Sequence, residues 1–184
     1  MRKALCMMGI LDDVDMEWLA NHGTVKHVSP GEVLIQEGKP IDALFILLDG
    51  QLSVSVGTSN ATHIATLLSG EIVGEISFVD SRTPSASVTA VQDSEVLVLP
   101  RQLLAMKLAN DLPFAARFYR AVATFLSDRL YVTVGRFGYG SHRQDVDPDE
   151  LQGSSIDDID LAAVRFDKLL RRLRKGDDRA EALG

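Results

Sequence analysis

Between Thr24 and Leu99 the sequence is a succession of short β-forming runs separated by turn glycines, and no other feature constrains the fold as tightly. The glycines of these turns are Gly31, Gly38, Gly50, Gly57 and Gly70. The run QLSVSV alternates, which predicts a strand with one buried face, whereas ALFILL is apolar throughout and suits a strand covered on both faces. Many short strands at close spacing form a sandwich or barrel, so we predict a mainly β fold closed as a jelly-roll β-barrel.

Helical patterns flank this β region on both sides. Residues 11–22 predict a short helix, which Asp12 or Asp13 can cap. After Pro100 the run RQLLAMKLAN predicts another short helix, and a long helix follows from about 112 to 136. We therefore expect a first domain over residues 1–136, with the jelly roll at about 24–99 and its helices at about 101–136.

The long helix carries two adjoining apolar stripes, which together are wider than one side of a barrel usually requires. Such a helix either packs only on its own domain or also pairs with a second copy of itself. We favour the second interpretation and predict a homodimer through helix 112–136. The stripes are Phe114, Phe118, Val122 and Phe125, and Tyr119, Leu126, Leu130 and Val134.

The C-terminal part reads as a polar linker at 137–154 and an amphipathic helix at 155–176. Ser154 or Ser155 can form a capping box, and the basic run RRLRK before Gly176 complements the helix dipole. We predict that this helix docks, either on its own domain or on an unknown protein partner through residues 155–175. Its expected apolar face comprises Ile159, Ala163, Phe166, Leu170 and Leu173.

Composition excludes several classes of function. The formal net charge of −7 argues against non-specific binding to nucleic acids or membranes. The single Cys6 excludes internal disulfides and cysteine zinc clusters. The N-terminus does not resemble a signal peptide, and no apolar run is long enough to span a bilayer, so we expect a cytoplasmic protein.

Motifs for catalysis or metal binding are weak. The four histidines show no metal-ligand spacing or triad pattern. The run DVDPDE begins like a calcium loop, but Glu150 stands where glycine is needed and Ile156 where glutamate is needed. We therefore predict no catalytic residue, no metal site and no cofactor.

The segment VGEISFVDSRTPSASVTA has the composition of a phosphate pocket. Gly74 would let the backbone approach a ligand, and the carboxylate of Glu75 suits a ribose hydroxyl. Small side chains leave room for backbone N–H groups to face a phosphate. Taken alone, the residues favour a Gly-Glu turn between two strands without a ligand. The small residues are Ser77, Ser85, Ala86 and Ser87.

This segment and the earlier LIQEGKPIDALFILLDG resemble the two signatures of the cyclic nucleotide-binding domain family, in particular the sensor domain of catabolite-activator-type regulators. Lys39 and Ile41 depart from the family's usual residues, whereas the later cassette matches over nearly its full length. The resemblance covers roughly residues 10–136. It implies a regulatory protein whose ligand-binding positions are Gly74, Glu75, Ile76, Ser77, Pro84, Ser85, Ala86 and Ser87.

By this resemblance, Glu75 would hold the ribose 2′-hydroxyl, and the amides of Ser77 and Ser85 would hold the exocyclic phosphate oxygens. Residues of the long helix such as Thr124 or Ser127 would read the base. Regulators of this family that bind DNA have a winged helix-turn-helix after the long helix. Residues 137–184 supply one linker and one helix, so we expect no direct DNA binding.

One departure falls on the phosphate site, because the family's arginine aligns with Pro84. Loss of one member of a buried charged pair costs about 2–5 kcal/mol. Arg82, two residues upstream, is a candidate to replace it. We therefore expect a non-enzymatic signalling regulator that binds cyclic AMP or cyclic GMP weakly or not at all. The alternative is a ligand-free dimeric scaffold for protein interaction.

Overall fold

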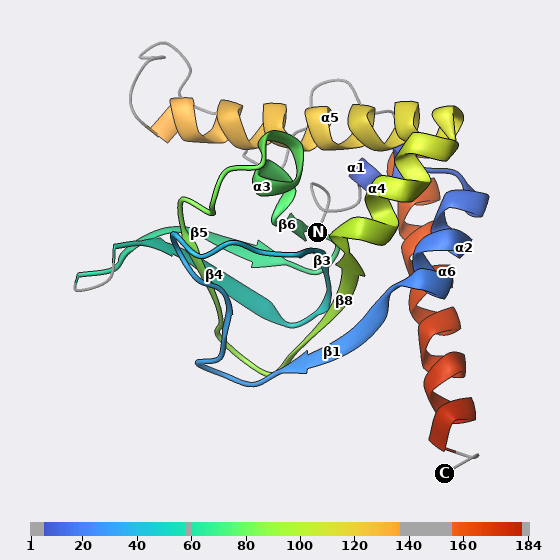
Figure 1. Ribbon diagram of the computed structural model, residues 1–184, viewed down its shortest axis with the longest axis horizontal. Coiled ribbons are helices and arrows are strands. Elements are labelled where there is room, and N and C mark those ends of the chain that lie inside the picture. The colour runs from blue at the N-terminus through green and yellow to red at the C-terminus, as the bar shows by residue number, and fades with distance from the viewer. Residues whose placement is uncertain (1–5, 58–59, 137–155, 182–184) are drawn as a thin grey trace.

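Two four-stranded antiparallel sheets form the centre of the molecule and face each other as a jelly roll (Figure 1). The computed structural model describes residues 6–57, 60–136 and 156–181. One sheet has the order β1-β8-β3-β6 and the other β2-β7-β4-β5. The predicted jelly-roll fold is confirmed. The strands are β1 (Thr24–Val28), β2 (Val33–Ile35), β3 (Ala43–Asp49), β4 (Gln51–Val56), β5 (Thr62–Leu68), β6 (Ile72–Val73), β7 (Ser87–Ala90) and β8 (Ser94–Pro100).

Strand β3 is buried on both faces, as its apolar sequence predicts. Phe45 and Leu47 pack between the sheets with Leu52 of β4. Leu44 and Ile46 point the other way, into a second core beneath the helices. The strand β4 is less regular than its alternating sequence predicts, because only Leu52 is fully buried. The outer face of β3 therefore packs against the helices and joins them to the barrel.

The helices are gathered on that side of the barrel. They are α1 (Cys6–Ile10), α2 (Asp13–His22), α3 (Glu75–Asp80), α4 (Arg101–Asn110), α5 (Leu112–Arg136) and α6 (Ile156–Glu181). Asp12 caps α2 in a capping box with Asp15. The carboxylate of Asp111 accepts a hydrogen bond from the N–H of Phe114 at 3.0 Å and so caps α5. The short helices α1 and α3 were not predicted.

The long helix α5 has the predicted bounds and lies over the end of the barrel (Figure 1). Its first stripe is buried throughout, with Phe114 and Phe118 at 0% and 1% exposure. The second stripe is divided: Leu126 packs against the core, whereas Tyr119, Leu130 and Val134 are exposed. The domain therefore covers only one side of this helix.

Helix α6 differs from its prediction in length and in which residues are buried. It continues through Gly176 to Glu181, and the residues after the glycine include the helix formers Arg179 and Ala180. Among the side chains of 161–174, which the structure describes, Ala162 and Leu169 are buried, while the predicted Ala163 is exposed and the predicted Ile159 lies outside this range. The set of buried residues differs because this face meets α1 and α2, a contact that helical periodicity cannot specify. Phe166, Leu170 and Leu173 join the core as predicted.

The predicted linker 137–154 and the predicted start of α6, with its capping box, lie wholly or partly outside the described residues. The boundary of the first domain at residue 136 stays a prediction. Among the helices that the structure describes, none is long and apolar enough to cross a membrane.

Candidate functional site

The cassette that the sequence singles out runs from the end of β6 through α3 and a loop into β7, and α3 lies directly under α5 (Figure 1). Gly74 precedes α3 with φ of 90°, a left-handed conformation that favours glycine. A β-carbon at this position would lie 2.8 Å from Cδ1 of Ile41 and 3.3 Å from the carbonyl oxygen of Ala43. Packing and backbone conformation thus explain this glycine without any ligand.

We expect Gly74→Ala to destabilise the domain by about 1–2 kcal/mol, because it adds left-handed strain and a contact with Ile41. The measurement is urea unfolding followed by circular dichroism. Gly31→Ala is the matched control, since its φ is also positive, at 82°, but no atom lies within 4 Å of the added β-carbon. Equal destabilisation by the two variants would show that the contact with Ile41 contributes nothing.

Glu75 is buried and already paired. Its side chain is 2% exposed, and Oε1 accepts a hydrogen bond from Nη1 of Arg129 on α5 at 2.7 Å. The same guanidinium donates to the carbonyl oxygen of Ile72 at 3.1 Å and lies 4.2 Å from the ring centre of Phe125. Burial raises the pKa of Glu75, and the positive charge of Arg129 opposes that rise. The carboxylate expected to meet a ribose therefore meets an arginine of its own chain.

Sequence analysis missed Arg129. The signal was present, because Arg129 follows Phe125 by one helical turn on the buried side of α5. A charged residue on an apolar stripe usually has a buried partner. Sequence alone does not identify that partner, which lies 54 positions away.

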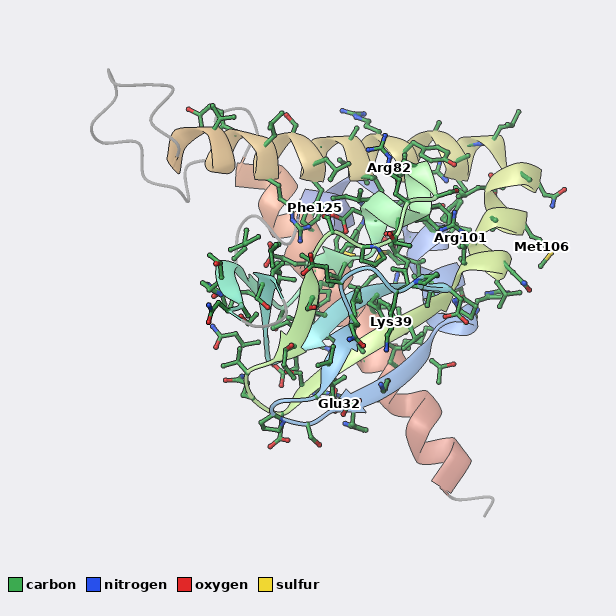
Figure 2. All side chains as sticks on the ribbon, turned by 60° about the vertical axis from the view of Figure 1, so that its left-hand side comes forward. Glu32, Lys39, Arg82, Arg101, Met106 and Phe125 are labelled. Carbon is green, nitrogen blue, oxygen red and sulfur yellow. The ribbon has the colours of Figure 1, made fainter. Side chains whose placement is uncertain are left out.

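A second arginine, Arg101 at the start of α4, fixes the other end of α3. Its guanidinium donates to the carbonyl oxygens of Ser77 at 2.7 Å and Phe78 at 3.2 Å, and to the hydroxyl of Ser81 at 3.0 Å. Phe78 lies in the last turn of α3, where a helix leaves carbonyl oxygens without intrahelical partners, whereas the carbonyl oxygen of Ser77 also accepts the N–H of Ser81 at 3.1 Å. Figure 2 shows Arg101 pointing toward α3 from α4. The position of the cassette helix is therefore set by arginines from both α4 and α5.

The part of the cassette that follows α3 is hydrogen-bonded to the first signature, the segment LIQEGKPIDALFILLDG. The carbonyl oxygen of Pro84 accepts from the N–H of Gly38 at 2.8 Å, and the hydroxyl of Ser87 accepts from the N–H of Glu37 at 3.0 Å. Pro84 and Ala86 are half-buried, and Ser85 is exposed. The structure thus brings the two signatures together.

Other predicted residues are exposed or have partners close by in the sequence. Ile76 is 49% exposed. Arg82 is 84% exposed and pairs with Asp80 of its own loop at 3.3 Å. The hydroxyl of Thr124 donates to the carbonyl oxygen of Arg120 at 2.9 Å, and Ser127 is exposed on α5. Arg82 therefore has a local partner, and neither base-reading residue is held toward Glu75 by a hydrogen bond to the cassette.

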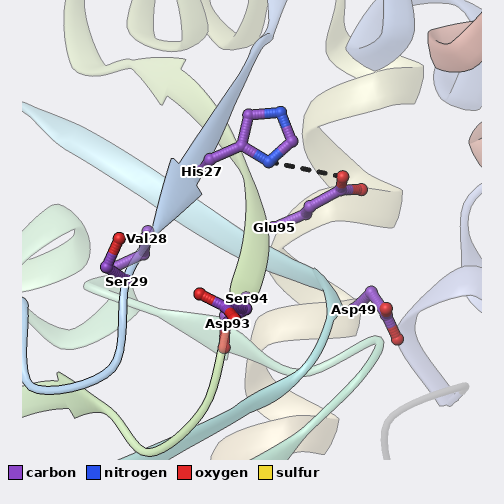
Figure 3. A pocket seen from close by; sticks show the side chains of 7 residues that line it. All are labelled: His27, Val28, Ser29, Asp49, Asp93, Ser94 and Glu95. Atoms are coloured by element: carbon purple, nitrogen blue, oxygen red, sulfur yellow. Dashed lines mark ion pairs between the residues drawn. The ribbon is translucent and has the colours of Figure 1, made fainter.

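Two hollows of the described surface are lined by residues other than Gly74, Glu75 and those around Pro84. The hollow in Figure 3 measures about 270 Å³ and lies at the turn ends of β1 and β8, where His27 is 3.4 Å from Glu95. The other, of about 310 Å³, is lined by Phe78, Arg101, Ala105, Leu108, Ala109 and Tyr119. Within the described ranges no group of three histidine, cysteine or acidic side chains could hold a metal ion.

Comparisons with known proteins agree on the family. Residues 25–111 match the family model described as cyclic nucleotide-binding domain. A cGMP-dependent protein kinase, egl-4 of Caenorhabditis briggsae, is 37% identical over 76 residues, which are 41% of this chain and 10% of the kinase. Lysophospholipase nte1 of Aspergillus oryzae is 33% identical over 93 residues, 50% of this chain and 6% of that protein. The chain thus matches only a small part of these relatives.

Solved structures show the same fold. A cyclic nucleotide-binding domain from Methylobacillus flagellatus superposes with a TM-score of 0.65 at 23% identity, covering 74% of this chain and 78% of that one. The catabolite activator protein of Thermus thermophilus superposes with a TM-score of 0.58 at 22% identity, covering 91% of this chain and 85% of that one. Similarity at this level concerns the arrangement of strands and helices.

Proposed function

Because the chain carries a domain of the cyclic nucleotide-binding family, we propose that it is a non-enzymatic signalling regulator whose pocket binds cyclic AMP weakly or not at all. The observation that carries the proposal is the buried pair of Glu75 and Arg129. In this arrangement the carboxylate that a ribose would need is neutralised by a side chain of the same protein. A nucleotide would have to share or replace that partner.

The phosphate side of the pocket supports the same conclusion. A cyclic phosphate carries a full negative charge, for which a guanidinium is the fitting partner. Pro84 supplies neither a charge nor an N–H. Arg82 is exposed and paired with Asp80, so the nearest cation in the sequence is directed elsewhere. Backbone amides alone offer partial charges against the cost of removing the phosphate from water.

Calorimetric titration of the unaltered protein with cyclic AMP, and separately with cyclic GMP, tests the proposal. We expect no saturation at low micromolar nucleotide. Arg82→Ala is the control for the local arginine and should leave the result unchanged. Saturable binding at low micromolar concentration would contradict the proposal. If that binding were lost in Arg82→Ala, Arg82 would be the cation that replaces the arginine absent at position 84.

A second candidate function, a ligand-free dimeric scaffold, is favoured by the outer side of α5. Leu130 and Tyr131 are each 64% exposed and Val134 is 43% exposed. These neighbouring side chains form an uncovered apolar strip toward the end of the helix. A second copy of the same helix would cover it. This function would need no nucleotide, and neither candidate includes direct contact with DNA.

We expect the protein to be a homodimer at high micromolar concentration, and Leu130→Glu to make it monomeric because a charge would replace the centre of the apolar strip. Multi-angle light scattering measures both states. Val91→Glu is the control, since Val91 is 52% exposed at a strand turn far from α5 in the sequence. A monomer in the unaltered protein would refute the scaffold.

A further inference from the structure

Helix α6 packs against α1 and α2 (Figure 1). Its buried residues Ala162 and Leu169 belong to the same apolar core as Phe114 and Phe118 of α5. Helix α1 contacts both α5 and α6. The packing of α6 is therefore continuous with the packing of the helix that holds Arg129.

Charged contacts reinforce this packing. The guanidinium of Arg165, whose side chain is 16% exposed, donates to the carbonyl oxygen of Gly9 in α1 at 2.9 Å and to Asp13 of α2 at 3.2 Å. Lys168 lies 2.9 Å from the same carboxylate. Arg172 lies 2.6 Å from Glu17, one turn further along α2. The basic side of α6 thus matches the acidic side of α2.

The N-terminal turn of α2 connects these contacts to α5. Asp13 faces α6, whereas its neighbour Asp15 is buried and accepts two hydrogen bonds from Arg117 of α5, at 2.6 and 2.8 Å. Asp12 lies 3.1 Å from the same guanidinium. Arg117 and Arg129 are separated by about 18 Å along one continuous helix. One acidic turn therefore joins α6 to the helix above the cassette.

We propose that α6 is an intramolecular strap: through α1 and the acidic turn of α2 it holds α5 in the position that keeps Arg129 on Glu75. Releasing α6 then loosens α5 and frees the carboxylate. The strap is separable from the barrel, because most of its ion pairs are exposed and each such pair contributes little. Only its last step, the effect on nucleotide affinity, rests on the proposed function.

The strap is tested in the full chain with Leu169→Asp, which places a charge on the buried side of α6. Val164→Asp is the matched control, because it makes the same kind of change on the same helix at a side chain that is 65% exposed. Hydrogen exchange is measured over α6, α5 and α3. In Leu169→Asp we expect exchange to rise about tenfold or more in α6 and also across Arg117–Arg129 and α3. Faster exchange in α6 alone would overturn the proposal.

A milder pair of variants changes an exposed ion pair of α6 and so avoids the loss of folding that a charge at the buried Leu169 can cause. Arg172→Glu should speed exchange in α6 and α5 in the same pattern, and adding Glu17→Arg should reverse the effect by restoring the ion pair with opposite charges. No reversal would count against the charged contact. Emission of Trp18, the single tryptophan, reports the same event, because its ring lies 5.5 Å from that of Phe114 on α5.

The effect on the pocket is measured separately, in a Pro84→Arg background titrated with cyclic AMP. Leu169→Asp should raise the affinity about threefold or more, since Arg129 then competes less for Glu75. Unchanged or weaker binding would overturn the link between strap and pocket. If Pro84→Arg itself gains no binding, the explanation by the missing arginine fails, while the exchange data still decide whether α6 restrains α5.

Discussion

Replacing Pro84 by arginine is expected to strengthen binding of cyclic AMP tenfold or more, which corresponds to about 1.4 kcal/mol at least. The backbone at this position is already held, because the carbonyl oxygen of Pro84 accepts from the N–H of Gly38, and an arginine keeps that carbonyl. The substitution adds the full positive charge that a cyclic phosphate lacks in this pocket. Isothermal titration of both proteins at the same ionic strength measures the gain.

Two further variants show whether the gain comes from the pocket. Pro84→Lys supplies charge without the planar fork of a guanidinium and should give a smaller gain. Glu75→Gln in the Pro84→Arg background keeps the size of the side chain but removes its charge, and should abolish much of the gain if Glu75 holds the ribose. A Pro84→Arg protein that binds no better than the unaltered one would refute our explanation of the missing arginine.

Replacing Arg129 by methionine is expected to destabilise the domain by about 3 kcal/mol, because it leaves the buried carboxylate of Glu75 without its charged partner. Urea unfolding measures the loss. Arg120→Met is the matched control, since Arg120 lies on the same helix but is exposed, and should change stability by about 0.5 kcal/mol at most. Replacing both members of the pair, in the double variant Glu75→Met with Arg129→Met, should recover most of the stability that Arg129→Met loses.

The effect of Arg129→Met should also depend on pH. Burial raises the pKa of Glu75 in the folded protein, so its contribution to stability is full below the unfolded-state pKa and falls as pH rises through the folded one. Without Arg129 the pKa rises further, because the charge that opposed burial is gone. The loss of unfolding free energy caused by Arg129→Met should therefore be largest at about pH 7 and smaller at about pH 5. A pH-independent loss would show that Glu75 is not left charged.

Sequence patterns predicted the elements whose formation depends little on which other elements they pack against. The alternation and apolar runs between Thr24 and Leu99 predicted strands, because a sheet needs one or two buried faces whatever lies opposite. The long helix has the predicted bounds, since Asp111 can cap it without help from elsewhere. The cassette residues are likewise next to one another in the chain, so their grouping was visible without a structure.

Only the tertiary structure decided what those residues meet. Glu75 pairs with a residue 54 positions away, α6 buries Ala162 and Leu169 where Ala163 was predicted, and Arg82 pairs with Asp80. Each of these outcomes depends on the distance between elements, which neither composition nor periodicity contains. The sequence by itself predicted the barrel and, through the family resemblance, a phosphate-site position at which Pro84 stands in place of an arginine. Only the fold determined that the carboxylate of Glu75 is already paired with Arg129. Burying this carboxylate requires a partner, and α5 passes close enough to supply one.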